Sequence, residues 1–106
     1  MVRHYSAKTD ENQPDIVKVF RDAGATVGLI HRAGSGVPDL IVGYRGFDVQ
    51  VEVKMPAKLK LTPKEAEYHD SWKGHKVAVI SSDSEARGLL ENINIYADYR
   101  DAANAR

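Results

Sequence analysis

The chain has 106 residues, of which 42% are hydrophobic and 28% charged, and this is typical of one soluble globular domain. Fifteen Lys and Arg residues balance fifteen acids, so the sequence lacks the basic excess of a protein that coats nucleic acid by charge alone. The absence of cysteine excludes disulfides, thiolate metal sites and cysteine nucleophiles. No apolar run could span a bilayer and no signal-peptide pattern is present, so we expect a cytoplasmic or intraviral protein without a membrane partner.

Hydrophobic periodicity and turn signals divide the chain into seven expected elements. Capping boxes are expected to open three helices, at Asp10 and Gln13, at Thr62 and Glu65, and at Ser82 and Glu85. A tight turn at residues 44–47 is expected to join two strands into a hairpin. In chain order we expect a helix over 10–23, strands over 26–30, 40–42 and 48–54, a helix over 62–72, a strand over 77–80 and a helix over 82–92. A flexible connector with two glycines, residues 33–36, separates the first two strands.

This order, α-β-β-β-α-β-α, predicts an α/β domain with a mixed β-sheet flanked by helices. We expect a single domain over 1–106, with a core at 10–92 and a C-terminal extension over 93–106. Residues 93–99 fit both a short amphipathic helix and a strand. Residues 1–9 carry no periodic pattern.

Two acids and a lysine on the expected hairpin form a candidate site. Asp39 opens one arm, while Glu52 and Lys54 lie toward the far end of the other, so the hairpin brings all three to one end of the sheet. Neighbouring carboxylates repel each other unless a cation lies between them, and oxygen ligands suit Mg²⁺ or Mn²⁺. Such a cation polarises a phosphate oxygen, and a nearby lysine orients the nucleophile. The arrangement therefore predicts phosphodiester hydrolysis.

The motifs around these residues resemble those of a known nuclease family. The run Gly36–Gly43 (GVPDLIVG), then Glu52-Val53-Lys54, then Leu61-Thr62-Pro63 resembles the VRR-NUC branch of the PD-(D/E)XK nuclease superfamily, including its small stand-alone phage members. The resemblance implies a restriction-endonuclease-like fold, a metal-dependent nuclease activity and a location in the cytoplasm of a bacterial or phage-infected cell.

The resemblance also implies a role for each matching residue. Asp39 and Glu52 would bind the metal together with the backbone carbonyl of Val53, and Lys54 would assist the attacking water. Many members add a glutamate from the first helix, for which Glu11 is the candidate here. The family often carries a glutamine facing the active site where this chain has Glu65, and the changed charge would alter metal affinity or phosphate contact.

Each of these residues also has a structural interpretation. Asp39 follows a proline and fits a turn. Glu52 and Lys54 fit an exposed pair on the polar face of an edge strand. Tyr68 and Trp72 are expected to pack in the core rather than to stack on bases. The histidines are expected at the surface or at helix caps, and no zinc site is expected.

Basic residues near the site are candidates for DNA binding. Lys58 and Lys60 lie in the loop after the hairpin, and Arg32 and Arg45 flank the connector and the hairpin turn. All four positions also suit side chains that are simply solvated.

Taken together, the sequence predicts a Mg²⁺- or Mn²⁺-dependent endonuclease acting on DNA, without a small-molecule cofactor. No base-reading module is evident, so selectivity for branched or junction DNA is expected. One site cuts one strand, and by analogy with Holliday-junction resolvases we expect a homodimer, with Ile93, Ile95 and Tyr96 as interface candidates. The alternatives are a non-catalytic DNA-binding or assembly protein with a nuclease-like fold, and a structural α/β protein without a nucleic-acid role.

Overall fold

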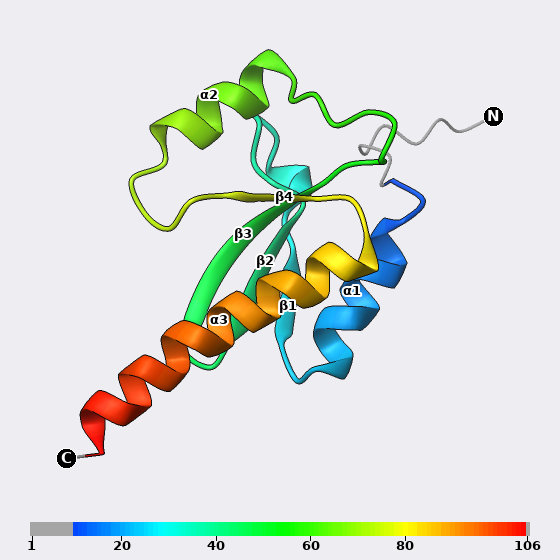
Figure 1. The fold of residues 1–106 in the computed structure, drawn as a ribbon. Helices are drawn as coiled ribbons and strands as arrows, with labels where there is room; N and C mark the ends of the chain where they lie inside the picture. Colours follow the sequence, from blue (N-terminus) through cyan, green and yellow to red (C-terminus); the bar gives the residue numbers. More distant parts are fainter. Residues whose placement is uncertain (1–9, 106) are drawn as a thin grey trace.

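A computed structural model describes residues 10–105, and residues 1–9, for which no pattern was found, lie outside this part (Figure 1). The observed order confirms the α-β-β-β-α-β-α expectation and adds one short 3₁₀ helix, η1, where the connector begins. The elements are α1 (Gln13–Asp22), β1 (Thr26–Leu29), η1 (His31–Ala33), β2 (Leu40–Tyr44), β3 (Phe47–Val53), α2 (Pro63–Ser71), β4 (Ala78–Ile80) and α3 (Asp83–Asn104). No helix in this part of the chain is long and apolar enough to cross a membrane.

The four strands form one mixed sheet in the order β1-β2-β3-β4. The first three strands are antiparallel neighbours, and β4 joins β3 in parallel after the crossover through α2. Helices α1 and α3 lie together on one face of the sheet, while α2 lies on the other side, above the end of β3 (Figure 1). The mixed sheet flanked by helices is therefore confirmed.

The hairpin between β2 and β3 is closed by Arg45 and Gly46. Both residues have positive φ angles, of 50° and 86°, which is the backbone pattern of a two-residue type I′ turn. This turn fixes the register in which Leu40 pairs with Val51. The register matters because it decides which residues meet at the opposite end of the hairpin.

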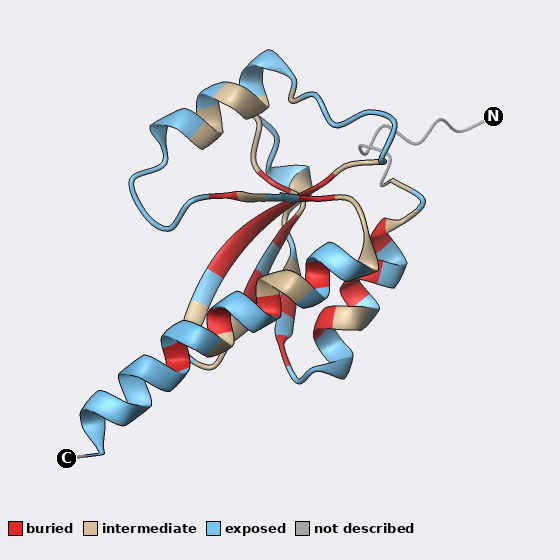
Figure 2. Ribbon diagram, in the orientation of Figure 1, coloured by how far each residue is buried: buried red, intermediate tan, exposed pale blue. Residues whose placement is uncertain are grey.

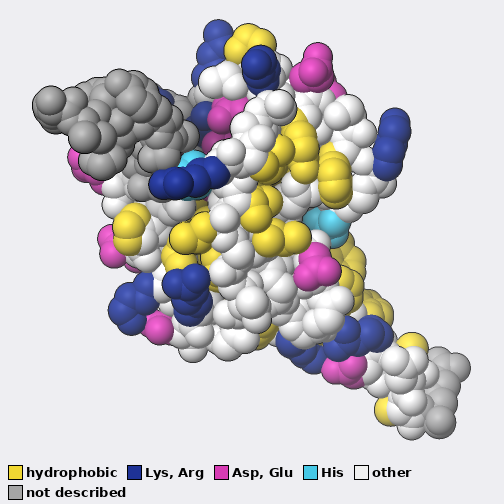
Figure 3. Space-filling view, turned by 180° about the vertical axis from the view of Figure 1, so that it is seen from behind, with side chains coloured by type: hydrophobic (Ala, Val, Ile, Leu, Met, Phe, Trp, Pro, Cys, Tyr) yellow, Lys and Arg dark blue, Asp and Glu magenta, His cyan; other side chains and the backbone are white. Residues whose placement is uncertain are grey.

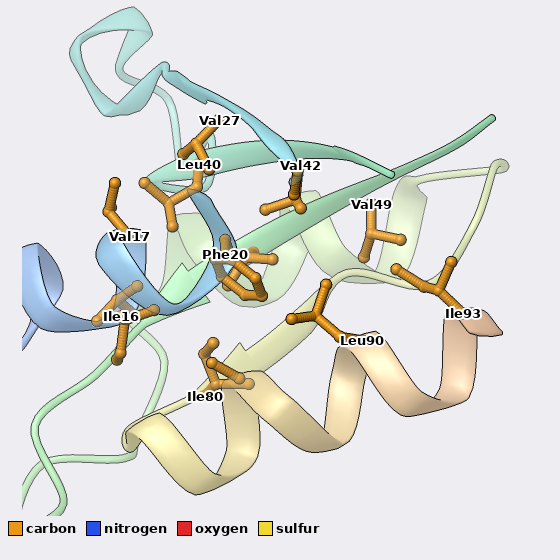
Figure 4. Close-up of a cluster of buried hydrophobic side chains, with 14 residues drawn as sticks. Ile16, Val17, Phe20, Val27, Leu40, Val42, Val49, Ile80, Leu90 and Ile93 are labelled. Atoms are coloured by element: carbon orange, nitrogen blue, oxygen red, sulfur yellow. The ribbon is translucent and has the colours of Figure 1, made fainter. Parts of the chain in front are cut away.

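The core lies between the sheet and the α1–α3 layer (Figure 4). Alternate residues of β3 (Val49, Val51 and Val53) point into it and meet Phe20 of α1 and Leu90 of α3. Buried positions follow the strands and the inner faces of α1 and α3, whereas α2 contains no buried residue (Figure 2). Helix α2 is consequently held by a few polar contacts rather than by the core.

Two helix boundaries differ from the expectation. The capping box of Asp10 and Gln13 does not form, because the N-cap is Asn12 and makes no side-chain cap. Helix α3 does not end near Asn92 but continues to Asn104, so the open question over residues 93–99 is settled in favour of a helix. Ile93 is only 4% exposed and belongs to the core, which removes it from the candidate dimer interface.

Candidate active site

The hairpin register brings Asp39 beside the end of β3. Leu40 pairs with Val51, so Asp39, one residue before β2, lies next to Glu52 and Val53. The backbone N–H of Val53 donates to Asp39 Oδ2 at 2.9 Å, and the N–H of Ile30 donates to the Asp39 carbonyl oxygen at 2.9 Å. The Asp39 carboxylate is thus fixed against the strand that carries the other site residues, rather than projecting from a turn.

Glu52 is buried at the centre of the sheet. Its strand lies between β2 and β4, and Glu52 is only 3% exposed, so the interpretation as an exposed pair on an edge strand is wrong. Its Oε1 atom is buried and has no hydrogen-bond partner in the described part of the chain. A buried polar atom without a partner is costly and uncommon in native proteins, and functional sites are a frequent reason for it.

The two carboxyl groups strongly affect each other. Burial, the neighbouring Asp39 charge and the Glu65 charge raise the pKa of Glu52 to about 9. Burial also raises the pKa of Asp39, although the hydrogen bond from the Val53 backbone opposes this shift. Without a cation between them, burial and mutual repulsion therefore favour a proton held by the pair near neutral pH.

Lys54 reaches the same place from the strand end. Its ammonium group donates a hydrogen bond to Glu65 Oε1 at 2.7 Å and lies 3.8 Å from Glu52 Oε2. The same Glu65 oxygen accepts from the N–H of Thr62 at 2.8 Å, in the capping box that was expected at the start of α2. Burial would favour the neutral lysine, but the pairing with Glu65 outweighs it and raises the pKa of Lys54.

These residues line an open cavity of about 290 Å³. Asp39, Glu52, Val53 and Lys54 form its sheet side, and its other walls come from the segment after η1, the first turn of α2 and Asp10. Gly36 makes the close contact between two of these walls possible, because a Cβ atom there would lie 2.2 Å from the carbonyl oxygen of Lys64. Its φ of 80° is also a conformation that favours glycine.

Sequence reasoning did not identify Asn12 as a residue that supports the site. Its side-chain amide donates to the carbonyl oxygen of Lys54 at 3.0 Å and to that of Ser81 at 2.9 Å. The start of α1 is thereby tied to the ends of β3 and β4, directly behind the site. A capping asparagine is the ordinary interpretation of this position, and only the fold shows that the side chain turns toward the sheet.

The structure places the two acids just before α1 differently from the expectation. Asp10 lines the cavity, whereas Glu11, the expected helix ligand, is exposed and is not among the lining residues. Asp10 also acts electrostatically on Asp39 and Lys54. His31 is the histidine of the described chain that reaches the cavity wall.

The four basic candidates divide into two groups. Lys58, Lys60 and Arg32 are exposed, the lysines in the loop that leads from β3 to α2. Arg45 was a candidate for phosphate contact, and the structure shows it in ion pairs with Asp98 at 2.9 Å and Asp101 at 2.8 Å. It therefore fastens the hairpin turn to α3, at the other end of the sheet from the cavity.

Two further expectations concern Trp72 and metal binding by histidine. The expected core packing of Trp72 is wrong, because the side chain is 46% exposed and stacks on Tyr68. Within residues 10–105 no group of three or more His, Asp or Glu side chains is arranged to hold a metal ion.

The donors at the cavity nevertheless fit a hard divalent cation. The unpartnered, buried Glu52 oxygen and the mutually unfavourable carboxyl pair are both relieved when a cation lies between Asp39 and Glu52. The Val53 carbonyl oxygen could add a third oxygen ligand. Mg²⁺ commonly uses one or two carboxylates and keeps several waters, so two acidic side chains suffice.

A solved structure described as a VRR_NUC domain is similar to this chain. The two share 27% sequence identity, the match covers 77% of this chain and 97% of the other, and the TM-score is 0.62. No family model and no curated protein matches the sequence. The chain has a VRR-NUC-like nuclease fold, as the motifs around Asp39 and Glu52 predicted.

Proposed function

We propose that the protein is a metal-dependent endonuclease that hydrolyses DNA phosphodiester bonds. The observation that carries the proposal is the pair of carboxyl groups, Asp39 and the buried Glu52, held side by side next to Lys54 in an open cavity. The VRR-NUC-like fold supports a nuclease. Mg²⁺ or Mn²⁺, when bound, would act as a Lewis acid for a phosphate oxygen and lower the pKa of a bound water.

Different residues of the chain would bind the cation, orient the attacking water and position the lysine. Asp39 and Glu52, with the Val53 carbonyl, would hold the cation at the sheet end. Lys54 would orient the attacking water and stabilise the negative charge that develops on the phosphate. Glu65 keeps the Lys54 ammonium at the cavity through the 2.7 Å hydrogen bond. Asp10, in place of Glu11, is the acid of the N-terminal segment that adds negative charge at the cavity.

We propose that phosphate contacts come from exposed residues at the rim. Lys58, Lys60 and Arg32 are exposed, and Lys64 lines the cavity itself. Such contacts position DNA without reading sequence, which is consistent with selectivity for DNA shape, such as a branch or junction. Their contribution is expected to fall steeply as the salt concentration rises.

Cutting both strands of a branched substrate would require two sites, and we propose a homodimer. Of the interface candidates, Ile95 and Tyr96 are 54% and 62% exposed on α3, and Tyr99 nearby is 75% exposed. Because Ile93 and Ala97 are buried, truncation before this segment would damage the core. Sedimentation of Ile95→Glu is the cleaner test, and a monomer is expected if α3 forms the interface.

The cleavage test uses labelled linear, nicked, flapped and four-way-junction DNAs with Mg²⁺ or Mn²⁺. Asp39→Asn and Lys54→Ala are expected to abolish cleavage, because they remove a cation ligand and the group that orients water. The matched controls are Asp48→Asn, an exposed acid at the other end of β3, and Lys18→Ala, an exposed lysine of α1. DNA binding without cleavage in either metal would favour the non-catalytic alternative.

A further inference from the structure

We propose that Trp72 forms a stacking platform for an unpaired DNA base, at the far end of a track that leads from the cavity along α2. This inference rests on the proposed function, since it concerns how the same substrate is held. It is based on the stacked pair of Tyr68 and Trp72, which is not part of the hydrophobic core.

The track begins at the catalytic cavity and follows one face of α2. Glu65 and Tyr68 lie three residues apart on one face of α2, and Trp72, the C-cap residue just beyond the helix, stacks on Tyr68. This face lies over the polar side of β3, where Lys54 donates to Glu65 and the Tyr68 hydroxyl donates to Gln50. Trp72 therefore continues a row whose first member holds the site lysine.

Trp72 is exposed but fixed in place. Its ring stacks on Tyr68 with centroids 5.4 Å apart and planes inclined by 16°, and Tyr68 is anchored by Gln50, which is only 8% exposed. Gly74 lies against the ring edge, since a Cβ atom there would be 2.7 Å from the indole nitrogen. Tyr68 covers one ring face, and 46% of Trp72 remains exposed. A nucleobase stacked on the exposed part of the ring would extend an existing aromatic stack at little entropic cost.

The charges around this face suit a phosphate backbone. Lys58, Lys60, Lys64, Lys73 and Lys76 are all exposed, against Glu67 and Asp70 among the exposed acids of the same segment. Seen from the side opposite to Figure 1, hydrophobic side chains gather in the middle of the face, with basic and acidic side chains around them (Figure 3). Basic groups beside an exposed aromatic ring are the usual combination for binding single-stranded nucleic acid.

The same charges disfavour a second copy of this chain as the occupant. A two-fold symmetric contact centred on Trp72 would bring identical residues of two chains together, including the neighbouring Lys73. The negatively charged phosphates of DNA, in contrast, pair favourably with these lysines. The rise of about 1.5 Å per helical residue puts Trp72 roughly 12 Å from Lys64 at the cavity, a distance that a few nucleotides can span.

The test uses the fluorescence of Trp72, which is the only tryptophan of the chain. The full chain is titrated with a short single-stranded oligonucleotide, and separately with a blunt hairpin duplex of equal charge, in EDTA so that no turnover occurs. Anisotropy of the labelled DNA reports binding independently. We expect quenching by the single strand that saturates together with the anisotropy, and weaker quenching by the duplex.

Variants make the test specific. Trp72→Ala is expected to weaken single-strand binding about 5- to 100-fold, while Trp72→Phe retains most of it. The matched control is Leu29→Ala, which removes another exposed hydrophobic side chain, at 58% exposure, outside the α2 segment, and is expected to leave the affinity unchanged. Circular dichroism confirms the fold of each variant, and the wild-type quenching needs no variant at all.

The outcomes separate this inference from the proposed function. DNA binding with unchanged Trp72 fluorescence, or no binding of single strands, overturns the platform even if cleavage depends on Asp39. Fluorescence that changes with protein concentration in the absence of DNA assigns the surface to a second copy and also overturns it. Loss of cleavage in Asp39→Asn bears on the endonuclease alone.

Discussion

The Lys54 ammonium group donates its hydrogen bond to Glu65 Oε1 at 2.7 Å. This contact joins the end of β3 to α2, a helix that has no buried residue of its own. The position of Lys54 and the attachment of α2 to the sheet therefore both depend on the Glu65 carboxylate. Burial disfavours the charged Glu65, but the bonds from Lys54 and the Thr62 backbone outweigh it and lower the pKa of Glu65. The acid therefore stays ionised and keeps Lys54 charged at the cavity.

Removing this carboxylate should affect both stability and catalysis. Glu65→Ala loses a capping contact and the Lys54 partner, so we expect a loss of about 1 kcal/mol in the free energy of unfolding by urea denaturation. In the cleavage assay we expect kcat to fall at least about 10-fold with a small change in KM, as Lys54 loses its position. Glu65→Gln keeps a neutral acceptor and should retain most of the activity. Glu67→Ala, an exposed acid of the same helix, is the control, and wild-type kcat in Glu65→Ala would contradict the role of Glu65.

A second prediction concerns Asn12, the residue that ties α1 to the sheet behind the site. Asn12→Ala leaves the Lys54 and Ser81 carbonyl oxygens without their donor, and we expect a cost of about 1 to 3 kcal/mol in urea denaturation. Asn12→Asp is expected to cost at least as much, because a carboxylate cannot donate. Asn92→Ala, at an exposed position of α3, should change stability by less than about 0.5 kcal/mol. Equal stability of Asn12→Ala and Asn92→Ala would show that the two bonds are unimportant.

Local patterns were sufficient for much of this fold. The capping box of Thr62 and Glu65 and the tight turn before β3 were predicted because their signals depend on neighbouring residues alone. The meeting of Asp39 with Glu52 followed from the hairpin, since antiparallel pairing fixes which residues face each other. These are the features for which short-range chemistry and strand alternation are enough.

Other features depend on contacts between distant segments. The side chain of Asn12 turns from its own helix to carbonyl groups at residues 54 and 81, which no local pattern specifies. The hydrophobicity of Trp72 predicts a core position. Helix α2, however, has no buried residue and contacts the sheet through polar groups, so the ring of Trp72 at its end stays exposed. Likewise, the ion pairs of Arg45 with Asp98 and Asp101 require that α3 continue beyond the sheet.

The buried carboxyl pair predicts an unusual pH dependence of stability. The pKa of Glu52 is raised from 4.5 to about 9 in the folded chain, so between these values the folded state binds a proton that the unfolded state has released. Stability must then fall as the pH rises through this window. In EDTA, we expect the free energy of unfolding to drop by on the order of 1 to 2 kcal/mol from pH 6 to pH 8.

Two comparisons assign this drop to Glu52. Glu52→Gln has no such proton and should lack this drop over the same range, and it should be more stable than the wild type at pH 8 without metal. Addition of Mg²⁺ or Mn²⁺ at pH 8 should stabilise the wild type by binding the folded state, and should have little effect on Glu52→Gln. A wild type whose stability rises from pH 6 to pH 8 in EDTA would refute the protonated pair.

The last prediction uses two glycines with opposite surroundings. Gly36 has a φ of 80°, and a Cβ atom there would lie 2.2 Å from the Lys64 carbonyl oxygen, so Gly36→Ala must displace the start of α2 or strain the loop. We expect a cost of about 2 kcal/mol or more in urea denaturation, together with weaker cleavage, because both cavity walls shift. Gly88 lies within α3 with nothing within 4 Å of the added Cβ, so Gly88→Ala should stabilise the chain by about 0.5 to 1 kcal/mol through helix propensity. If Gly36→Ala lowers the free energy of unfolding and Gly88→Ala raises it, the loss at Gly36 comes from the contact between the connector and α2. An unchanged stability of Gly36→Ala would show that this cavity wall tolerates movement.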